Sequence, residues 1–365
     1  MQTKKKVLHL LASGGIGGIE VLLRDYAKYS HHENLFLFVW GGGEVAEQIR
    51  QSGNEIYILS CEERTLRKLC RRIIELCREQ EIDTLVVHNA APVLRCALIA
   101  VTIAGIGVQT VTYAHSDAAD IYETGRKGWR IRKFIYGCSF SWADKVVAIS
   151  HSVEQSLYRT WNLPPGKIKV IYNGVDIDRF YGTAKVGHRP LRLLYVGRLT
   201  KEKGVQTIID ALAQMSCPER FHLAIVGDGP FRRALEDQVQ RLKLTDMIHF
   251  YGKSSDVPQY MAEADVFLHM PQWEEGFGLT VVEAMASGLL CVCGAKGALP
   301  EILTDGETGI LLQEVTGGEL AKCLETLPQR YESRELREMR RNAVTAAQRF
   351  SIRRFTEELD AVLGR

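Results

Sequence analysis

The chain has 365 residues, of which 46% are hydrophobic and 25% charged, and its net charge is +2 at pH 7. This is the composition of a globular protein long enough for two domains, and the near-neutral charge gives no reason to expect nucleic acid as a partner. The nine cysteines are scattered through apolar stretches without zinc-like spacing, so we expect reduced thiols in a cytosolic protein and no metal site. The longest apolar tract, 97–108, is shorter than the roughly 20 residues of a membrane-spanning helix.

Short apolar strands alternate with amphipathic helices along the whole chain. The first half predicts strands at 7–11, 35–39, 56–59, 84–88, 109–113, 146–149 and 169–172, with helices at 20–29, 62–79 and 130–142. The second half predicts strands at 193–196, 223–226, 248–251, 266–270 and 290–293, with helices at 205–214, 231–241 and 281–287. Uniformly apolar strands separated by helices indicate parallel sheets covered on both faces.

We therefore predict an α/β protein made of two doubly wound, Rossmann-like domains. The segment 181–190 lacks apolar periodicity, which places the domains at 1–183 and 184–348, followed by an amphipathic helix within 349–365. Ligands of such sheets bind beyond the carboxyl ends of the strands.

The segment 275–283 carries the most specific local signal. The helix expected there begins at Gly278, Leu279 and Thr280. The backbone N–H groups of these first residues have no partner within the helix, so they favour a bound anion. Glu283 lies about one turn inside this helix and can accept hydrogen bonds from ribose or sugar hydroxyls, while Glu275 can reach a second hydroxylated group. The alternative is an ordinary capped helix with solvated acids.

Two further loops follow predicted strands. Gly15, Gly17 and Gly18 lie after the first strand, where glycine allows close backbone approach to a ligand, although a tight turn without a ligand is the alternative. Arg198 and Lys203 follow the first strand of the second half, where two cations suit a diphosphate. Their alternative is a pair of ordinary surface cations.

Three other places are candidates. His115 closes a strand and can bond a sugar hydroxyl or assist proton movement, or it can be a structural histidine. The backbone of Gly252, after another strand, can line a base pocket. The aromatic and basic residues of 129–136 either lie on an anionic membrane surface or form a core-facing helix with a solvated basic edge.

Several motifs together resemble the family 4 retaining glycosyltransferases, which have the GT-B fold. The matching stretches run in order along nearly the whole chain, and they are 147–150, 172–176, 195–198 with 203–204, 226–230, 275–283, 300–302 and 305–309. The resemblance implies two Rossmann-like domains that face each other across a cleft and bind a nucleotide-sugar donor without a metal or other cofactor.

The resemblance also implies roles for single residues. Arg198 and Lys203 match the residues that hold the donor diphosphate, and Glu283 matches the one that binds the ribose. Glu275 matches a residue that touches the transferred sugar, and His115 one that lies beside it. The remaining donor contacts implied are Gly15, Gly17, Gly18, Asn173 and the amides of Gly278, Leu279 and Thr280, and Gly252 is a donor contact expected from its position alone.

The function expected from this resemblance is transfer of a hexose from a nucleotide diphosphate sugar, with UDP as the expected nucleotide. The acceptor would be a hydroxyl of a glycan or lipid-linked saccharide in surface polysaccharide synthesis, because the segment 113–117 is most similar to bacterial capsule and exopolysaccharide enzymes. We also expect a cytoplasmic protein, which would contact the inner membrane face through 129–136 if that helix lies on the bilayer and does not face the core. The alternatives are a non-catalytic nucleotide-sugar-binding protein and an NAD-dependent oxidoreductase, which would need a dinucleotide glycine spacing that the chain lacks.

Overall fold

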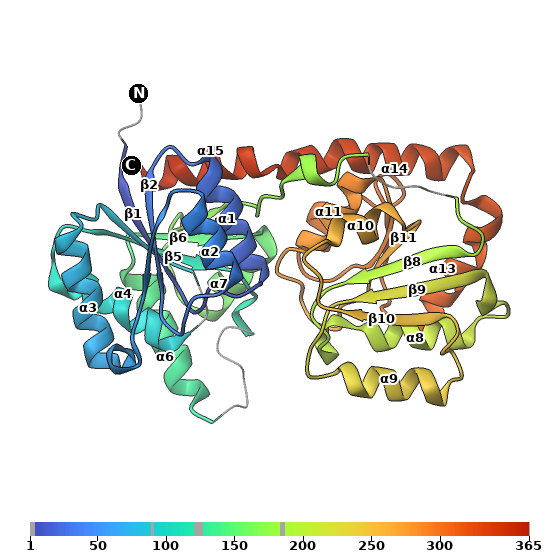
Figure 1. Cartoon of the computed structure of the whole chain (residues 1–365), viewed down its shortest axis with the longest axis horizontal. Coiled ribbons are helices and arrows are strands. Elements are labelled where there is room, and N and C mark those ends of the chain that lie inside the picture. Colours follow the sequence, from blue (N-terminus) through green and yellow to red (C-terminus); the bar gives the residue numbers. More distant parts are fainter. Residues whose placement is uncertain (1–3, 89–90, 120–126, 183–186, 365) are drawn as a thin grey trace. The chain divides into compact units, whose positions relative to one another are not determined.

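The structure, a computed structural model, describes residues 4–88, 91–119, 127–182 and 187–364. It divides into two compact units, one made of Met1–Val175 with Ile352–Arg365 and the other of Asp176–Ser351. Each unit is a parallel sheet with helices on both faces (Figure 1), which confirms the predicted doubly wound α/β architecture. Among the described residues, no helix is long and apolar enough to cross a membrane.

The sheet of the first unit has seven strands in the order β3-β2-β1-β4-β5-β6-β7, all parallel in the described chain. The strands are β1 (Lys6–Leu11), β2 (Glu33–Phe38), β3 (Glu55–Ile58), β4 (Thr84–Val87), β5 (Gln109–Ala114), β6 (Lys145–Ala148) and β7 (Ile168–Val170). The strand order reverses between β1 and β4. Chain segments that leave these two strands diverge, which opens the sheet edge at their carboxyl ends.

Helices cover both faces of this sheet. They are α1 (Gly18–Tyr29), α2 (Glu44–Gln51), α3 (Leu66–Glu79), α4 (Pro92–Ala104), α6 (Trp129–Trp142), α7 (His151–Thr160) and α15 (Ile352–Leu363). Side chains alternate along a strand, so Leu8 and Leu10 of β1 join the core under α3 and α4. His9 faces the other side, where its ring lies 5.5 Å from that of Tyr26 on α1.

One predicted helix is divided in the structure. The helix expected at 62–79 is a 3₁₀ turn, Cys61–Arg64, followed by α3. Thr65 between them has an extended backbone, with φ −68° and ψ 144°. Ser60 and Glu63 form a reciprocal capping box around the short turn, which stabilises it as a separate element.

The second unit contains a six-stranded parallel sheet in the order β10-β9-β8-β11-β12-β13. The strands are β8 (Leu191–Val196), β9 (Phe221–Val226), β10 (Ile248–Gly252), β11 (Val266–His269), β12 (Leu290–Gly294) and β13 (Ile310–Leu312). The last of these has only three residues and was not predicted. Here the order reverses between β8 and β11.

The helices of the second unit are α8 (Val205–Gln214), α9 (Arg232–Arg241), α10 (Val257–Ala262), α11 (Leu279–Ser287), α12 (Leu299–Ile302), α13 (Gly317–Arg330) and α14 (Arg334–Ala347). Helix α13 packs beside α8 on one face, and α11 packs beside α14 on the other. The core under α8 and α13 includes Leu193, Ile208 and Leu324, all at most 1% exposed. Apolar burial of this kind is the main force that holds such layers together.

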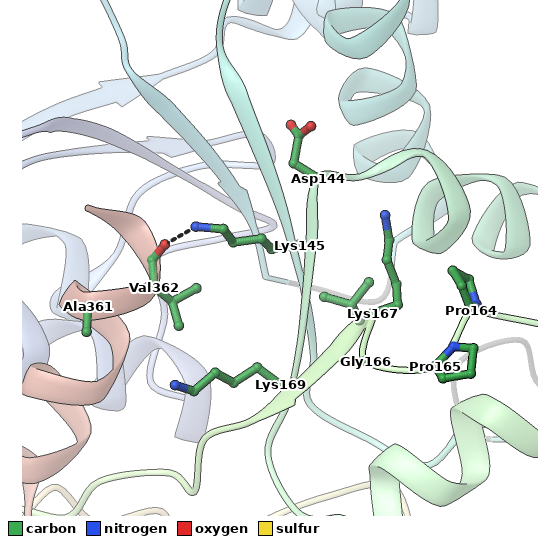
Figure 2. A pocket seen from close by; sticks show the side chains of 10 residues that line it. Asp144, Lys145, Pro164, Pro165, Gly166, Lys167, Lys169, Ala361 and Val362 are labelled. Atoms are coloured by element: carbon green, nitrogen blue, oxygen red, sulfur yellow. Dashed lines mark hydrogen bonds between the residues drawn. The ribbon is translucent and has the colours of Figure 1, made fainter. Parts of the chain in front are cut away.

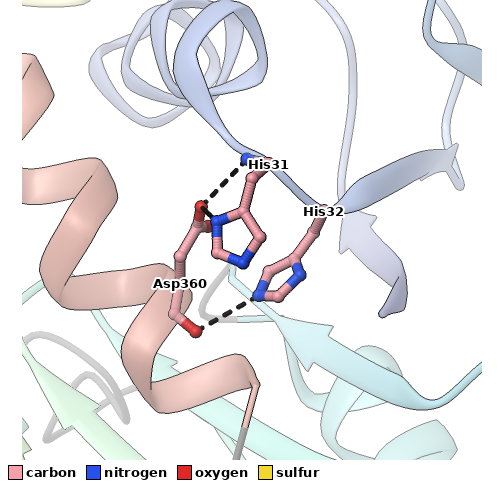
Figure 3. A group of neighbouring side chains, drawn as sticks. All are labelled: His31, His32 and Asp360. Carbon is pink, nitrogen blue, oxygen red and sulfur yellow. Dashed lines mark hydrogen bonds and ion pairs between the residues drawn. The ribbon is translucent and has the colours of Figure 1, made fainter. Parts of the chain in front are cut away.

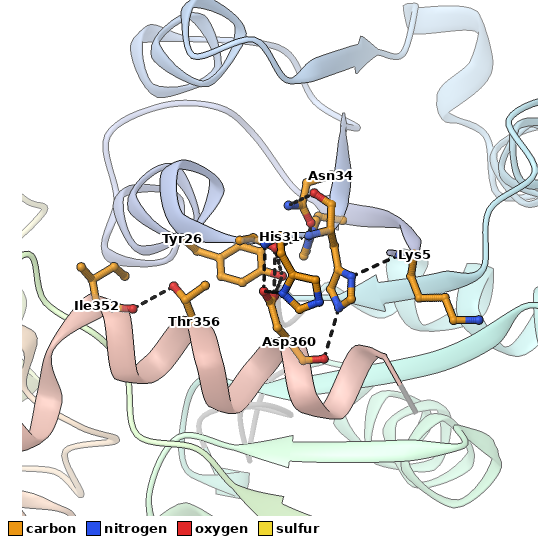
Figure 4. A network of polar contacts seen from close by, with 10 residues as sticks. Lys5, Tyr26, His31, Asn34, Ile352, Thr356 and Asp360 are labelled. Carbon is orange, nitrogen blue, oxygen red and sulfur yellow. Dashed lines mark hydrogen bonds and ion pairs between the residues drawn. The ribbon is translucent and has the colours of Figure 1, made fainter. Parts of the chain in front are cut away.

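Helix α15 packs in the first unit beside α1 (Figures 1 and 4). Asp360 is its polar anchor, since its carboxylate accepts hydrogen bonds from the Tyr26 hydroxyl at 2.6 Å, the Ser30 hydroxyl at 2.9 Å and the His31 amide at 3.1 Å. A Cβ atom at Gly174 would lie 2.6 Å from the Cβ of Phe355. The helix therefore needs both a satisfied buried carboxylate and a glycine to sit this close.

Candidate functional site

The loops after β8, β9 and β11 are tied together by their backbones. The Leu199 amide donates to the Asp228 carbonyl at 3.0 Å, and the Gln272 amide donates to the Glu202 carbonyl at 2.8 Å. Gly204 has a left-handed backbone with φ +72°, and a Cβ there would come within 1.6 Å of a backbone oxygen. The loops that carry the predicted site residues are thus fixed to one another at the position where the strand order reverses.

Lys203 and Glu275, both predicted site residues, are in direct contact. The Lys203 ammonium donates to Oε2 of Glu275 at 2.7 Å, and Nε2 of His269 lies 2.8 Å from the same oxygen. The side chains of Glu275 and His269 are 11% and 4% exposed, while that of Lys203 is 35% exposed. The arrangement is a mostly buried carboxylate held between two nitrogen donors, one of which reaches solvent.

The charge state of Glu275 follows from these neighbours. Burial is the largest influence and by itself raises the pKa of Glu275, but the Lys203 charge and the His269 hydrogen bond outweigh it. The pKa of Glu275 is therefore held well below its usual value, and the group is a carboxylate at neutral pH. Among the described residues, no donor pairs with its second oxygen, Oε1.

Helix α11 begins beside this pair. Gly278 caps it in a left-handed conformation with φ +106°, and its carbonyl accepts from the amides of Val281 and Val282. The amides of Leu279 and Thr280 come before the first intrahelical bond and have no acceptor in the described parts of the chain. Glu283, one turn inside, is half-buried. The predicted anion-binding helix start is therefore present as a geometry.

Arg198 and Gly252 occupy the mouths of β8 and β10. Arg198 is exposed, and no ion pair involves its guanidinium among the described residues. Gly252 has a left-handed backbone with φ +74°, and its carbonyl accepts from the Gly227 amide at 2.7 Å. Gly252 thus helps to join the loops, while Arg198 is free to meet a ligand.

The glycine-rich loop of the first unit divides into two kinds of position. A Cβ at Gly14 would lie 2.5 Å from the Cβ of Ala46, so packing requires that glycine. A Cβ at Gly15 would meet nothing within 4 Å among the described atoms. Gly17 caps α1 and Gly18 is its first residue. Packing therefore does not explain Gly15.

His115 follows β5 and is half-buried, with Nε2 lying 3.3 Å from Nδ1 of His88. Burial and the nearby Arg95 lower the pKa of His115 to about 3. Asn173 is 5% exposed, and its side-chain oxygen has no partner among the described residues. Both residues lie in the first unit, each with an unsatisfied polar atom that a ligand could satisfy.

One group among the described residues brings metal-ligand types together, namely His31, His32 and Asp360, whose ligand atoms lie within 4.8 Å of one another (Figure 3). Both ring nitrogens of His32 are already used. Nδ1 accepts from the Lys5 amide at 3.2 Å, which leaves Nε2 to donate to the Asp360 carbonyl at 3.2 Å. The carboxylate of Asp360 is engaged by the Tyr26 hydroxyl and by Nδ1 of His31 at 2.7 Å. These contacts anchor α15, and His32 has no ring nitrogen left to offer a metal.

A cavity of about 390 Å³ lies elsewhere in the first unit, between the amino ends of β6 and β7 and the end of α15 (Figure 2). Three lysines line it. Lys145 donates to the Val362 carbonyl and Lys167 to the Ala143 carbonyl, and Lys169 lies on β7. Since this is the amino edge of the sheet, the cavity is separate from the carboxyl-end positions described above.

Two family models match the chain. The model described as Glycosyl transferases group 1 covers residues 183–348, and the model described as Glycosyltransferase Family 4 covers residues 16–179. The chain belongs to the family 4 glycosyltransferases. The resemblance inferred from the motifs is confirmed, and so is the GT-B fold.

Individual relatives agree with this membership. The chain is similar to an N-acetyl-alpha-D-glucosaminyl L-malate synthase of Bacillus anthracis, 29% identical over 67% of this chain and 65% of that one. It also resembles a putative colanic acid biosynthesis glycosyltransferase of Salmonella typhimurium, 33% identical over 46% of this chain and 43% of that one. The chain thus spans under two thirds of the length of these two curated relatives.

Among solved structures, the fold matches Alr3699/HepE of Anabaena, crystallised in complex with UDP and with UDP-glucose. The TM-score is 0.82 and the identity 25%, over 98% of this chain and 99% of that one. A sucrose-phosphate synthase of Thermosynechococcus elongatus, 18% identical, has a TM-score of 0.80 over 98% of both chains and shows the same fold.

Sequence reasoning missed His269. It lies at the end of β11, six residues before Glu275, and it was counted only as part of an apolar strand. A histidine that ends a buried strand beside a predicted site was the signal available. His9 and His88 were overlooked in the same way, inside the strands predicted at 7–11 and 84–88.

Proposed function

We propose that this family member is a retaining hexosyltransferase. It moves a sugar from a UDP-sugar to a hydroxyl of a glycan or lipid-linked saccharide in surface polysaccharide synthesis. The observation that carries the proposal is the Lys203–Glu275–His269 cluster beside the free amides of α11, at the strand-order reversal of the second unit. The complexes of the Anabaena protein with UDP and UDP-glucose support the choice of donor.

Lys203 can serve the donor without releasing Glu275. An ammonium group has three protons, and one is engaged with Glu275, which leaves two for phosphate oxygens. Arg198 would add a bidentate contact, and the amides of Leu279 and Thr280 would meet the anion at the helix start. Negative charge that develops on the departing diphosphate would thus meet donors already in place, each typically contributing a few kcal/mol.

Glu275 and Glu283 would bind hydroxyl groups. Oε1 of Glu275 accepts nothing from the described residues, so a hydroxyl of the transferred sugar can donate to it, and Glu283 would take the ribose. On the resemblance, His115 would lie beside the transferred sugar. The same resemblance supplies the proposed donor contacts Gly15, Gly17, Gly18, Asn173 and Gly278, and Gly252 is added because it ends β10 at the carboxyl edge of the sheet.

Thermal stabilisation against UDP-, GDP- and ADP-sugars tests the donor. A ligand at a hundred times its Kd should add about 2.7 kcal/mol of stability. Arg198→Ala should abolish this gain, whereas Arg233→Ala, which removes an exposed arginine on α9, should keep it. A flat response to every nucleotide sugar would refute the proposal.

Turnover separates an enzyme from a binding protein. Donor consumption with retained anomeric configuration in the product, followed by NMR, is the expected outcome. Binding without donor hydrolysis or transfer to any saccharide acceptor would favour a non-catalytic nucleotide-sugar-binding protein. An inverted product would refute retention but not transfer.

Peripheral membrane contact through α6 is proposed for the same protein. Ile131 and Phe134, one helical turn apart, are 68% and 71% exposed, and Arg130 beside them is exposed and basic. Such a face suits an anionic bilayer. Flotation with phosphatidylglycerol vesicles should be lost in Ile131→Ser/Phe134→Ser and kept in Ile103→Ser, an equally exposed control on α4. Equal flotation of all three proteins would refute the contact.

A further inference from the structure

Three histidines of the first unit form a continuous hydrogen-bonded chain. Nε2 of His9 lies 3.0 Å from Oδ1 of Asn34, and Nδ1 of His9 lies 3.0 Å from Nε2 of His88. Nδ1 of His88 then lies 3.3 Å from Nε2 of His115. His9 is on β1, His88 follows β4 and His115 follows β5. The chain crosses three neighbouring strands and runs toward their carboxyl ends, across the strand-order reversal.

The rings are neutral at physiological pH. His9 and His88 are 0% and 1% exposed, and burial disfavours the charged form of an imidazole. Burial, the largest influence, lowers the pKa of His9 to about 4 and holds the pKa of His88 well below its usual range. The pKa of His115 is lowered in the same way. A neutral imidazole has one donor nitrogen and one acceptor nitrogen. Once one nitrogen of a ring is known to donate, its other nitrogen must accept, and this decides which nitrogen of the next ring donates.

Asn34 sets that direction. Its side-chain nitrogen donates to the His32 carbonyl at 3.3 Å, so the atom that faces His9 is the carbonyl oxygen, an acceptor. His9 must then donate from Nε2 and accept at Nδ1. His88 donates from Nε2 to His9 and accepts at its own Nδ1, and His115 donates from Nε2 to His88. The proton of His115 is committed to Nε2.

The consequence concerns the second ring nitrogen of His115, the last residue of this hydrogen-bonded series. Nδ1 of His115 carries a lone pair and is buried, and no described residue pairs with it. A buried acceptor without a hydrogen-bond donor is unfavourable, and a donor from a ligand would remove that cost. A hydroxyl can supply such a donor, whereas a carbonyl or phosphate oxygen cannot.

We infer that Asn34, His9 and His88 are positioning residues that fix His115 as a hydrogen-bond acceptor for a sugar hydroxyl. The identity of the ligand as a sugar rests on the proposed function, but the direction of hydrogen-bond donation from His115 through His88 and His9 does not. His115 in this state orients a hydroxyl and does not act as a proton donor at Nδ1.

Nitrogen NMR of the full chain, labelled with ¹⁵N histidine, tests the direction without any ligand. His9→Gln, His88→Gln and His115→Gln assign the signals. All three rings should be neutral and protonated at Nε2 at pH 7.5. Couplings across N–H···N bonds should link His88 to His9 and His115 to His88. A ring protonated at Nδ1, a charged His115, or missing couplings would overturn the inference.

A matched pair of variants tests the consequence for the ligand. In His88→Gln the amide oxygen can still accept from His115 and the amide nitrogen can still donate to His9, whereas His88→Leu offers neither. Under the proposed function, His88→Leu should lower kcat/KM about tenfold, roughly the effect of one lost hydrogen bond. His88→Gln should restore most of it, and in His88→Leu the ¹⁵N signals of His115 should show both tautomers.

The two arms separate the possible failures. Correct tautomers with equal kcat/KM in both variants would overturn the role toward the sugar and leave the proposed function standing. Correct tautomers with no transferase activity in the unmodified protein would count against the proposed function alone. Wrong tautomers would overturn the inference whatever the activity.

Discussion

From the partly buried Lys203–Glu275 pair we predict a stability effect that depends on pH with a defined sign. Lys203→Met keeps an unbranched apolar stem and removes one of the two donors on Oε2, while His269 remains on the same oxygen at 2.8 Å. Removing a donor from a buried carboxylate typically costs about 1–3 kcal/mol. Since the Lys203 side chain is 35% exposed, solvent replaces part of the contact, and we expect about 1–2 kcal/mol at pH 7.

The pH dependence follows from the lowered pKa of Glu275. A group whose pKa is depressed in the folded state contributes stability that is complete above its unfolded value, 4.5 for this carboxyl, and that is lost as pH falls toward the folded value. Proton uptake by the unfolded state is common to the original protein and Lys203→Met, so it cancels and the folded states set their difference. The difference should stay constant at neutral pH. It should shrink as pH falls through the pKa of Glu275 in folded Lys203→Met, which the loss of the Lys203 charge raises.

Hydrogen exchange of peptides from β8 and β11 is the suitable assay, because a chain of two units need not unfold in one transition. At each pH, the ratio of exchange rates between the two proteins gives the free-energy difference, about tenfold at pH 7. Glu275→Gln and the double variant complete a cycle, in which we expect a coupling of about 1–2 kcal/mol. A difference that grows as pH falls, or a coupling near zero, would refute the proposed charge state.

Two other substitutions test contacts inside each unit, one in the first unit and one in the second. Tyr26→Phe removes the 2.6 Å hydrogen bond to Asp360 and should cost about 1–3 kcal/mol in exchange protection of α15, whereas Tyr181→Phe, at a side chain 62% exposed, should cost almost nothing. Gly204→Ala would put a Cβ 1.6 Å from a backbone oxygen and should destabilise the second unit by more than about 3 kcal/mol, while Gly53→Ala, where φ is also positive but no atom lies within 4 Å, should cost about 1 kcal/mol. Equal losses within either pair would contradict the contacts described.

The sequence predicted the layers because burial on both faces leaves uniform apolar strands. It could not show β13, whose three residues are too few to form a recognisable pattern. It also joined the 3₁₀ turn at Cys61–Arg64 to α3, because Thr65 between them does not interrupt the apolar spacing. The spacing of apolar residues reveals periodic elements well, but it does not show a change of backbone angle at a single residue such as Thr65.

The candidate site was predicted as a set of residues and not as a set of contacts. Sharing one sheet edge brings Arg198, Lys203 and Glu275 near one another, yet nothing in the motifs indicates that Lys203 and Glu275, 72 residues apart, form an ion pair. His269 and His9 were hidden inside strands that were read only for their apolar neighbours. Alternation along β1 places His9 opposite Leu8 and Leu10, so a buried polar residue on a distinct face was detectable in principle.

The polar cluster of the second unit is costly to bury, and this leads to a last prediction. Buried ion pairs often stabilise a protein less than apolar residues of similar volume do. Replacing the whole cluster, as Lys203→Met/Glu275→Leu/His269→Phe, should therefore leave the second unit folded and at least as stable as Lys203→Met alone. His269 stacks near Tyr195, with ring centroids 6.3 Å apart, and a phenylalanine can keep that contact.

The same triple variant should lose all stabilisation by UDP-sugars, since no cation of the cluster and no carboxylate would remain for the donor. Hydrogen exchange of β8 and β11, measured with and without UDP-sugar, gives both quantities in one experiment. If the triple variant unfolds while Lys203→Met does not, the cluster is held for stability and not for a ligand. If it folds and still responds to the donor, the binding site lies elsewhere. A triple variant that stays folded and is not stabilised by UDP-sugar is the one outcome that agrees with a ligand-binding role for the Lys203–Glu275–His269 cluster.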